Sequence, residues 1–189
     1  MKKTLYFLVM LLAVTFSSCN KNDDDPDTTT GDGIPWGEIK GSLNDTWFFE
    51  NQESFAESDN PLAQTLLPVL INMLNTTREA EAYVFNSDKT YSQYWTSDQP
   101  NDQETGLYKE DGTYTLSDRD LTLTYTENGE TKTGEYQIVS LSDTQLVIYK
   151  DLLGIWGALA TEIVAPFDKM GIRPKRAYQI ITYTNVSKE

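Results

Sequence analysis

Short segments in which apolar and polar residues alternate dominate the chain after residue 42. The clearest is residues 121–126, where Leu121, Leu123 and Tyr125 share one face and threonines occupy the other. A period of two with one apolar face is typical of a β-strand that covers a core on one side only. The pattern therefore predicts a mostly β domain.

Eight strands are expected, separated by residues that favour turns. They span residues 43–50, 80–86, 90–96, 106–116 with an interruption at Glu110-Asp111, 121–126, 133–141, 144–150 and 176–185. Ser87-Asp88-Lys89 and Asn128-Gly129 are short enough to join neighbouring antiparallel strands as hairpins. Because closure of such a meander removes unpaired edges, the fold class predicted is an eight-stranded antiparallel barrel.

Two apolar segments depart from this pattern and are expected to be helical insertions. Residues 61–75 have helical length, an N-cap among residues 58–60, and Pro68, which is expected to kink or split the helix. The second insertion is residues 152–170. Each is expected to pack against the sheet or close an end of it; the alternative is contact with a membrane or a partner. The absence of Lys and Arg from residues 61–75 favours packing.

The N-terminus carries an export signal. Two lysines precede a mostly apolar run over residues 5–16, which is shorter than the ~20 residues that span a bilayer. Phe16-Ser17-Ser18-Cys19 reads as a lipobox, and this arrangement resembles bacterial lipoprotein processing, with cleavage before Cys19 and acylation of its thiol by palmitate-type chains. We therefore expect residues 1–18 to be a signal peptide and Cys19 to be a lipid anchor in the membrane.

Residues 19–37 are expected to form a flexible tether ahead of a barrel domain at 38–189. Residues 20–33 contain no large apolar side chain and therefore cannot offset the entropy of ordering. Their polar run is either only a tether or an export tag, since it resembles the tag of surface lipoproteins in Bacteroidetes-type bacteria. The tag residues would be Lys21, Asp23, Asp24 and Asp25. The expected location is the cell envelope, anchored to the outer membrane, with surface exposure left open.

Composition removes several classes of function. The formal net charge is −14, which disfavours nucleic acid as a partner. Histidine is absent and the one cysteine is assigned to lipid, so no cofactor, transition metal or thiol chemistry is expected. Carboxylates such as Glu79 and Glu127 fall at strand ends and are interpreted as solvated. No enzyme is expected, with an unrecognised carboxylate-based hydrolase as the alternative.

Several strand-and-turn motifs carry a resemblance to a known family. Residues 43–47, 83–91, 112–114 and 140–146 look like the lipocalin-like domains of Bacteroidetes lipoproteins, over roughly residues 40–187. The resemblance implies a calycin-like barrel whose interior either holds one small ligand or is filled by side chains. The glycine-x-tryptophan of lipocalins is represented here by Asp45-Thr46-Trp47, without the glycine.

Aromatic side chains in the strands are either core residues or the lining of a ligand site. The candidates for the lining are Trp47, Tyr91, Trp95, Tyr125 and Tyr136. The function predicted is non-catalytic binding of a small hydrophobic or glycan-type ligand by an outer-membrane lipoprotein. The alternative is an accessory lipoprotein with a filled barrel that contacts an envelope protein partner.

Overall fold

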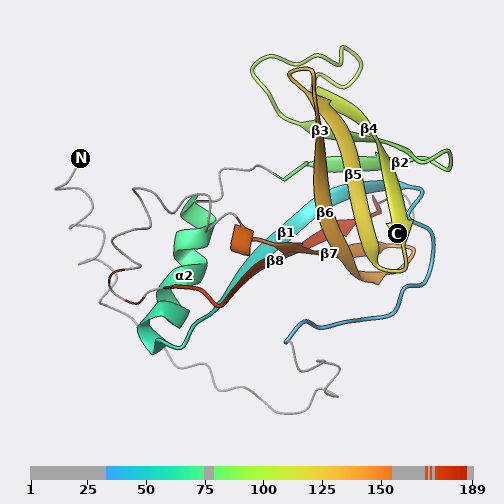
Figure 1. Cartoon of the computed structure of the whole chain (residues 1–189). Helices are drawn as coiled ribbons and strands as arrows, with labels where there is room; N and C mark the ends of the chain where they lie inside the picture. Colours follow the sequence, from blue (N-terminus) through green and yellow to red (C-terminus); the bar gives the residue numbers. More distant parts are fainter. Residues whose placement is uncertain (1–32, 75–78, 155–168, 170, 172, 187–189) are drawn as a thin grey trace.

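The computed structural model describes residues 33–74, 79–154, 169, 171 and 173–186 (Figure 1). The described part contains eight strands and one long helix. In chain order these are β1 (Thr46–Glu57), α2 (Pro61–Leu74), β2 (Ala82–Phe85), β3 (Thr90–Trp95), β4 (Tyr108–Ser117), β5 (Asp120–Glu127), β6 (Glu130–Leu141), β7 (Gln145–Asp151) and β8 (Arg176–Thr184). The predicted signal peptide, Cys19, the candidate tag residues and most of the second predicted helix lie outside the described residues.

The strands form a closed barrel in which each strand pairs with its sequence neighbour and β8 pairs with β1, always antiparallel. The predicted eight-stranded antiparallel barrel is therefore confirmed. Three hairpin turns use left-handed backbone, at Lys89 with φ 69°, at Asp118 with φ 55° and at Asn128-Gly129 with φ 51° and 80°. Asparagine and glycine adopt this conformation readily, which explains the turn at Asn128-Gly129. No helix in the described part of the chain is long and apolar enough to cross a membrane.

Strand β4 is continuous, so the predicted interruption at Glu110-Asp111 is wrong. Both acidic residues have polar partners directly opposite them on β3. Gln93 Nε2 donates to Glu110 Oε2 at 2.7 Å, and Ser92 Oγ donates to Asp111 Oδ1 at 2.6 Å. These cross-strand hydrogen bonds compensate for the low β-propensity of the carboxylates.

Helix α2 begins with Pro61 at its first position, where the missing N–H costs nothing. Asn60 caps it, since its carbonyl accepts a hydrogen bond from the Gln64 N–H. Pro68 lies inside the helix, which continues as one element, so the predicted split into two pieces is wrong. Its buried face packs against the inner side of β1 and β8 where these strands extend beyond the barrel (Figure 1), in a cluster of Ala63, Leu67, Ile71, Leu152 and Ala177.

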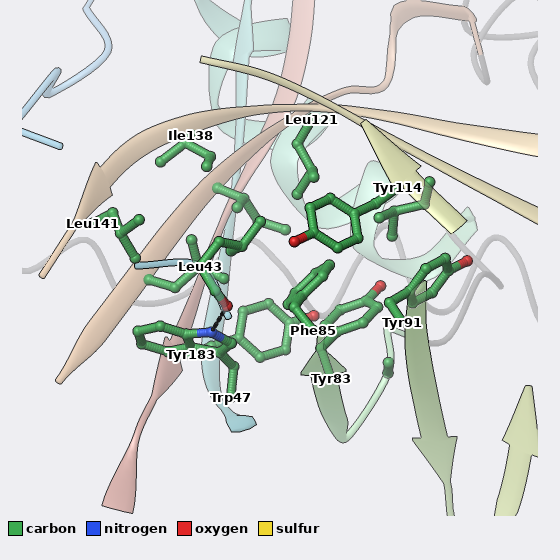
Figure 2. Packing of buried hydrophobic residues seen from close by; sticks show 14 of the residues in the cluster. Leu43, Trp47, Tyr83, Phe85, Tyr91, Tyr114, Leu121, Ile138, Leu141 and Tyr183 are labelled. Carbon is green, nitrogen blue, oxygen red and sulfur yellow. Dashed lines mark hydrogen bonds between the residues drawn. The ribbon is translucent and has the colours of Figure 1, made fainter. Parts of the chain in front are cut away.

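One end of the barrel, where β2 meets β3 and β6 meets β7, is closed by side chains. Trp47 is fully buried there, and its Nε1 donates to the Leu43 carbonyl at 2.9 Å (Figure 2). Tyr114 donates from its hydroxyl to Asn44 Oδ1 at 2.6 Å. The guanidinium of Arg119 donates to three main-chain carbonyls nearby, those of Gly37, Ile138 and Val139. We call this the closed end.

Residues 34–41 pack along the outside of the barrel. Ile34 is 3% exposed and lies in a cluster with Val139 and Tyr178, and Ile39 forms a parallel bridge with Leu141. The packed unit therefore starts before residue 38, where the tether was expected to end. Apolar Ile34 and Trp36 have enough surface to bury, unlike the polar residues that precede them.

Candidate functional site

The opposite end of the barrel holds a cavity of about 580 Å³. We call it the open-end cavity. Strands β3 and β5 finish there and β4 and β6 begin there (Figure 1). Its lining comprises Glu79, Ala80, Tyr83, Gln93, Trp95, Thr96, Ser97, Tyr108, Glu110, Leu123, Tyr125, Thr126, Glu127, Asn128, Gly134 and Tyr136.

Inward-facing positions of four strands supply the aromatic walls. The rings of Trp95 on β3 and Tyr108 on β4 have centroids 6.0 Å apart, and the two residues are direct cross-strand neighbours. Tyr125 on β5 and Tyr136 on β6 continue the lining. Tyrosine and tryptophan combine an apolar face with a hydrogen-bonding tip, so these walls suit a ligand that is partly apolar and partly polar.

Three of the five predicted lining residues, Trp95, Tyr125 and Tyr136, face this cavity; their contact with a ligand stays a prediction. Trp47 does not line it. That assignment is corrected, because Trp47 lies at the start of β1, at the closed end, where its ring fills the core. Tyr91 also belongs to the core cluster, 1% exposed, although its hydroxyl is directed away from Trp47 (Figure 2).

A buried ion pair lies in the wall of the cavity. Glu79 precedes β2, and its Oε1 lies 2.5 Å from Lys150 Nζ on β7, with only 5% and 13% of the two side chains exposed. The ammonium also lies 5.8 Å from the centre of the Tyr136 ring. The interpretation of Glu79 as a solvated surface charge is therefore wrong, because its side chain is buried and Lys150 is its partner.

Two tyrosines next to the ion pair are held in their neutral form. Burial raises the pKa of the Tyr136 phenol, and the negative charge of Glu79 raises it further. Burial likewise raises the pKa of Tyr83, with additional effects from Tyr136 and Tyr183. Because an ordinary tyrosine already titrates near pH 10, both hydroxyls remain protonated and available as hydrogen-bond donors at physiological pH.

Two further carboxylates, those of Glu110 and Glu127, line the cavity. Glu110 accepts a hydrogen bond from Gln93, as described above, and Glu127 ends β5. Burial raises the pKa of Glu110; the Gln93 hydrogen bond opposes this change, and repulsion from Glu127 adds to it. Glu127 was also interpreted as solvated, and it remains exposed while lining the cavity rim.

Replacing Glu110 by glutamine is expected to stabilise the protein near neutral pH. The amide oxygen can still accept the hydrogen bond from Gln93, whereas the partly buried charge is removed. Because the pKa of Glu110 is higher in the folded chain than its ordinary value of 4.5, wild-type stability falls as the pH rises through the interval between the folded and unfolded values. The stability gain of E110Q should therefore be smallest near about pH 4 and reach a plateau by about pH 7.

Urea unfolding at several pH values measures this gain. Glu135→Gln is the matched control, because Glu135 lies on the exposed outer face of β6. A gain that does not depend on pH, or one that E135Q reproduces, would contradict the assignment of Glu110 as a charge that burial disfavours.

The described residues contain no group of three or more His, Cys, Asp or Glu side chains that could hold a metal ion. A second, smaller hollow of about 240 Å³ lies outside the barrel, beside the stacked rings of Phe55 and Tyr178.

The alternative hypothesis of an accessory lipoprotein assumed that side chains fill the barrel. The open-end cavity shows that the barrel is not filled at this end.

A closed eight-stranded meander with one end packed and one end hollow defines a small β-barrel of the kind that encloses a single ligand. The comparison with protein families agrees with this architecture. The model of the Lipocalin-like domain matches residues 15–148, and the chain belongs to this family. No curated protein and no solved structure matched the chain.

The family and the barrel together suggest the binding of a small molecule, and lipocalin-like proteins are typically non-catalytic. The matched region ends within β7, so it leaves out β8, which the structure places between β7 and β1 to close the barrel.

Proposed function

We propose that this protein is a lipoprotein anchored through Cys19 to the outer membrane, and that it holds a small organic ligand in the open-end cavity without transforming it. The observation that carries the proposal is the cavity itself. It is large enough for a small ligand, and it combines aromatic walls with carboxylate, amide and hydroxyl groups. The lipobox at residues 16–19 and the polar run after it support the anchor and the envelope location.

The mixed lining favours an amphipathic ligand over a purely hydrocarbon one. A fatty chain would displace water from the carboxylates of Glu110 and Glu127 and supply no hydrogen-bond donor in its place, and such burial of charged groups is costly. A ligand with a flat apolar face and several hydrogen-bonding atoms would contact the rings and satisfy these groups together. Small aromatic compounds and sugar rings both have this character.

Mass spectrometry of protein purified from the membranes of its own host tests both the lipid anchor at Cys19 and the binding of a small ligand. The intact mass is expected to correspond to a chain that starts at Cys19 and carries acyl groups. Native mass spectrometry is expected to show a bound small molecule, which Trp95→Ala should lose, because this substitution removes one aromatic wall of the cavity.

Tyr94→Ala is the matched control, since Tyr94 lies on the same strand with its side chain on the opposite face of the sheet. A chain that keeps residues 1–18, or that carries no acyl group, would refute the anchor. A protein free of any bound small molecule, or one that loses it equally in Y94A, would refute the binding site.

A further inference from the structure

We infer that the ligand of the open-end cavity is an organic cation, an amine whose ammonium group lies between Glu110 and Glu127 while its apolar body lies against Trp95, Tyr108 and Tyr125. This inference rests on the proposed binding function and specifies the chemical class of the ligand. It follows from the charges that face the cavity and from the aromatic walls beside them.

The charges around the cavity do not cancel. Glu79 is neutralised by Lys150, and Lys132, which lies opposite Tyr125 at the rim, is paired with Glu130 at 2.8 Å. Glu110 and Glu127 remain, and no Lys or Arg among the described residues forms an ion pair with either of them. Glu110 lies in the wall of the cavity and Glu127 at its rim, and a cation bound between them would relieve their mutual repulsion.

The aromatic walls next to these carboxylates also suit a cation. Tyr108 and Glu110 lie on the same face of β4, two residues apart, and Tyr125 and Glu127 are related in the same way on β5. Each carboxylate is therefore preceded along its strand by a ring that faces the same space. The negative face of an aromatic ring attracts ammonium groups, and the effect is largest for tryptophan.

Tyr91 lies in the core beside the cavity and supplies no counter-charge to Glu110. Its ring packs against Gly112 on β4, two residues after Glu110, where an added Cβ would lie 3.0 Å from the ring carbon that carries the hydroxyl. Tyr91 is 1% exposed, burial raises the pKa of its phenol, and Glu110, Tyr136 and Tyr125 raise it further, so the phenol is neutral at physiological pH. The counter-charge of Glu110 is therefore left to the ligand.

Isothermal titration calorimetry with matched probes on the full chain in detergent tests the inference. The probes are phenethylamine, 2-phenylethanol and phenylacetate, which share a phenyl ring and differ in charge. Phenethylamine is expected to bind roughly tenfold or more tightly than 2-phenylethanol, and phenylacetate more weakly than both. Added salt should weaken the binding of the amine and leave that of the alcohol unchanged.

Variants assign the preference to the two carboxylates. Combined Glu110→Gln and Glu127→Gln should remove the preference for phenethylamine over 2-phenylethanol. Combined Glu104→Gln and Glu135→Gln, which removes the same charge from exposed sites away from the cavity, should retain it. Circular dichroism of each variant establishes that it is folded.

The outcomes separate this inference from the proposed function. Equal or tighter binding of 2-phenylethanol or of the neutral sugar cellobiose would overturn the cationic ligand and leave the binding function standing. A preference for the amine that survives the E110Q/E127Q change would overturn the assigned carboxylates. If no probe binds and the host protein carries no small molecule, both the inference and the proposed function fail.

Discussion

Replacing Lys150 by methionine is expected to destabilise the fold by about 3–5 kcal/mol, because it leaves the buried carboxylate of Glu79 without its counter-charge. Methionine keeps the length and apolar stem of lysine, so the loss of the charge dominates the effect. The 5% exposed Glu79 side chain has little access to water that could replace the ammonium. Chemical unfolding followed by circular dichroism measures the difference.

A second substitution distinguishes the loss of the pair from simple repacking. In the double variant E79Q/K150M neither partner is charged, and most of the lost stability should return. Lys132→Met is the matched control, since Lys132 forms an exposed pair with Glu130 at the same end of the barrel. Exposed pairs contribute about 0–1 kcal/mol. A cost of K150M no larger than that of K132M would contradict the buried ion pair.

Truncating Trp47 to alanine is expected to cost about 3–5 kcal/mol, because it empties the closed end of the barrel. The side chain is 0% exposed and contributes both ring volume and the hydrogen bond to the Leu43 carbonyl. Trp47→Phe should cost less than W47A, because it keeps much of the ring volume and loses the N–H donor. Guanidinium unfolding monitored by circular dichroism is suitable, since it does not depend on the tryptophan that is removed.

Trp95→Ala provides the comparison for the same chemical change at the open end. Trp95 is only partly buried and faces the cavity, so its removal should cost clearly less than that of Trp47. If W95A proved as destabilising as W47A, the open end would be a packed core and not a cavity. If W47A cost less than about 1 kcal/mol, the closed end would not depend on this ring.

Stability and binding are therefore assigned to opposite ends of one barrel. The closed end holds buried aromatic rings of the core and the hydrogen bonds that Arg119 donates to main-chain carbonyls. The open end holds the carboxylates of Glu110 and Glu127. The charge of Glu110 is expected to lower the stability of the fold at neutral pH, because burial raises the pKa of this group. Functional sites often retain such unfavourable groups because the ligand compensates for them.

Alternation along the chain was sufficient to predict the strands, and the turn residues were sufficient to predict their order. Asn128-Gly129 specified its hairpin because these residues adopt left-handed backbone readily. The same alternation contained part of the site. Lys150 follows Leu146 and Ile148 at a spacing of two, so it lies on their inward face, and Glu110 follows Tyr108 in the same way. The alternation of inward-facing and outward-facing positions along each strand was the signal that could have identified Lys150 and Glu110 as inward-facing residues.

The depth of each aromatic residue could not be read from its strand. Trp47 and Trp95 both face the interior, yet one fills the closed end and the other lines the cavity. Their positions along the barrel axis depend on the register of all eight strands and on which end α2 and the N-terminal segment cover. Glu79 was misassigned for a related reason, since its burial depends on a partner 71 residues away.

By itself, the sequence determined the mostly β class, the order of the strands, the family and the absence of histidine and thiol chemistry from residues after Cys19, because these follow from local patterns and composition. Only the tertiary structure decided that one end is packed and the other hollow, and that Glu79 meets Lys150 inside the barrel. It also placed Glu110 and Glu127 together beside aromatic rings. These are contacts between residues on different strands, and they exist only once closure of the barrel fixes the register.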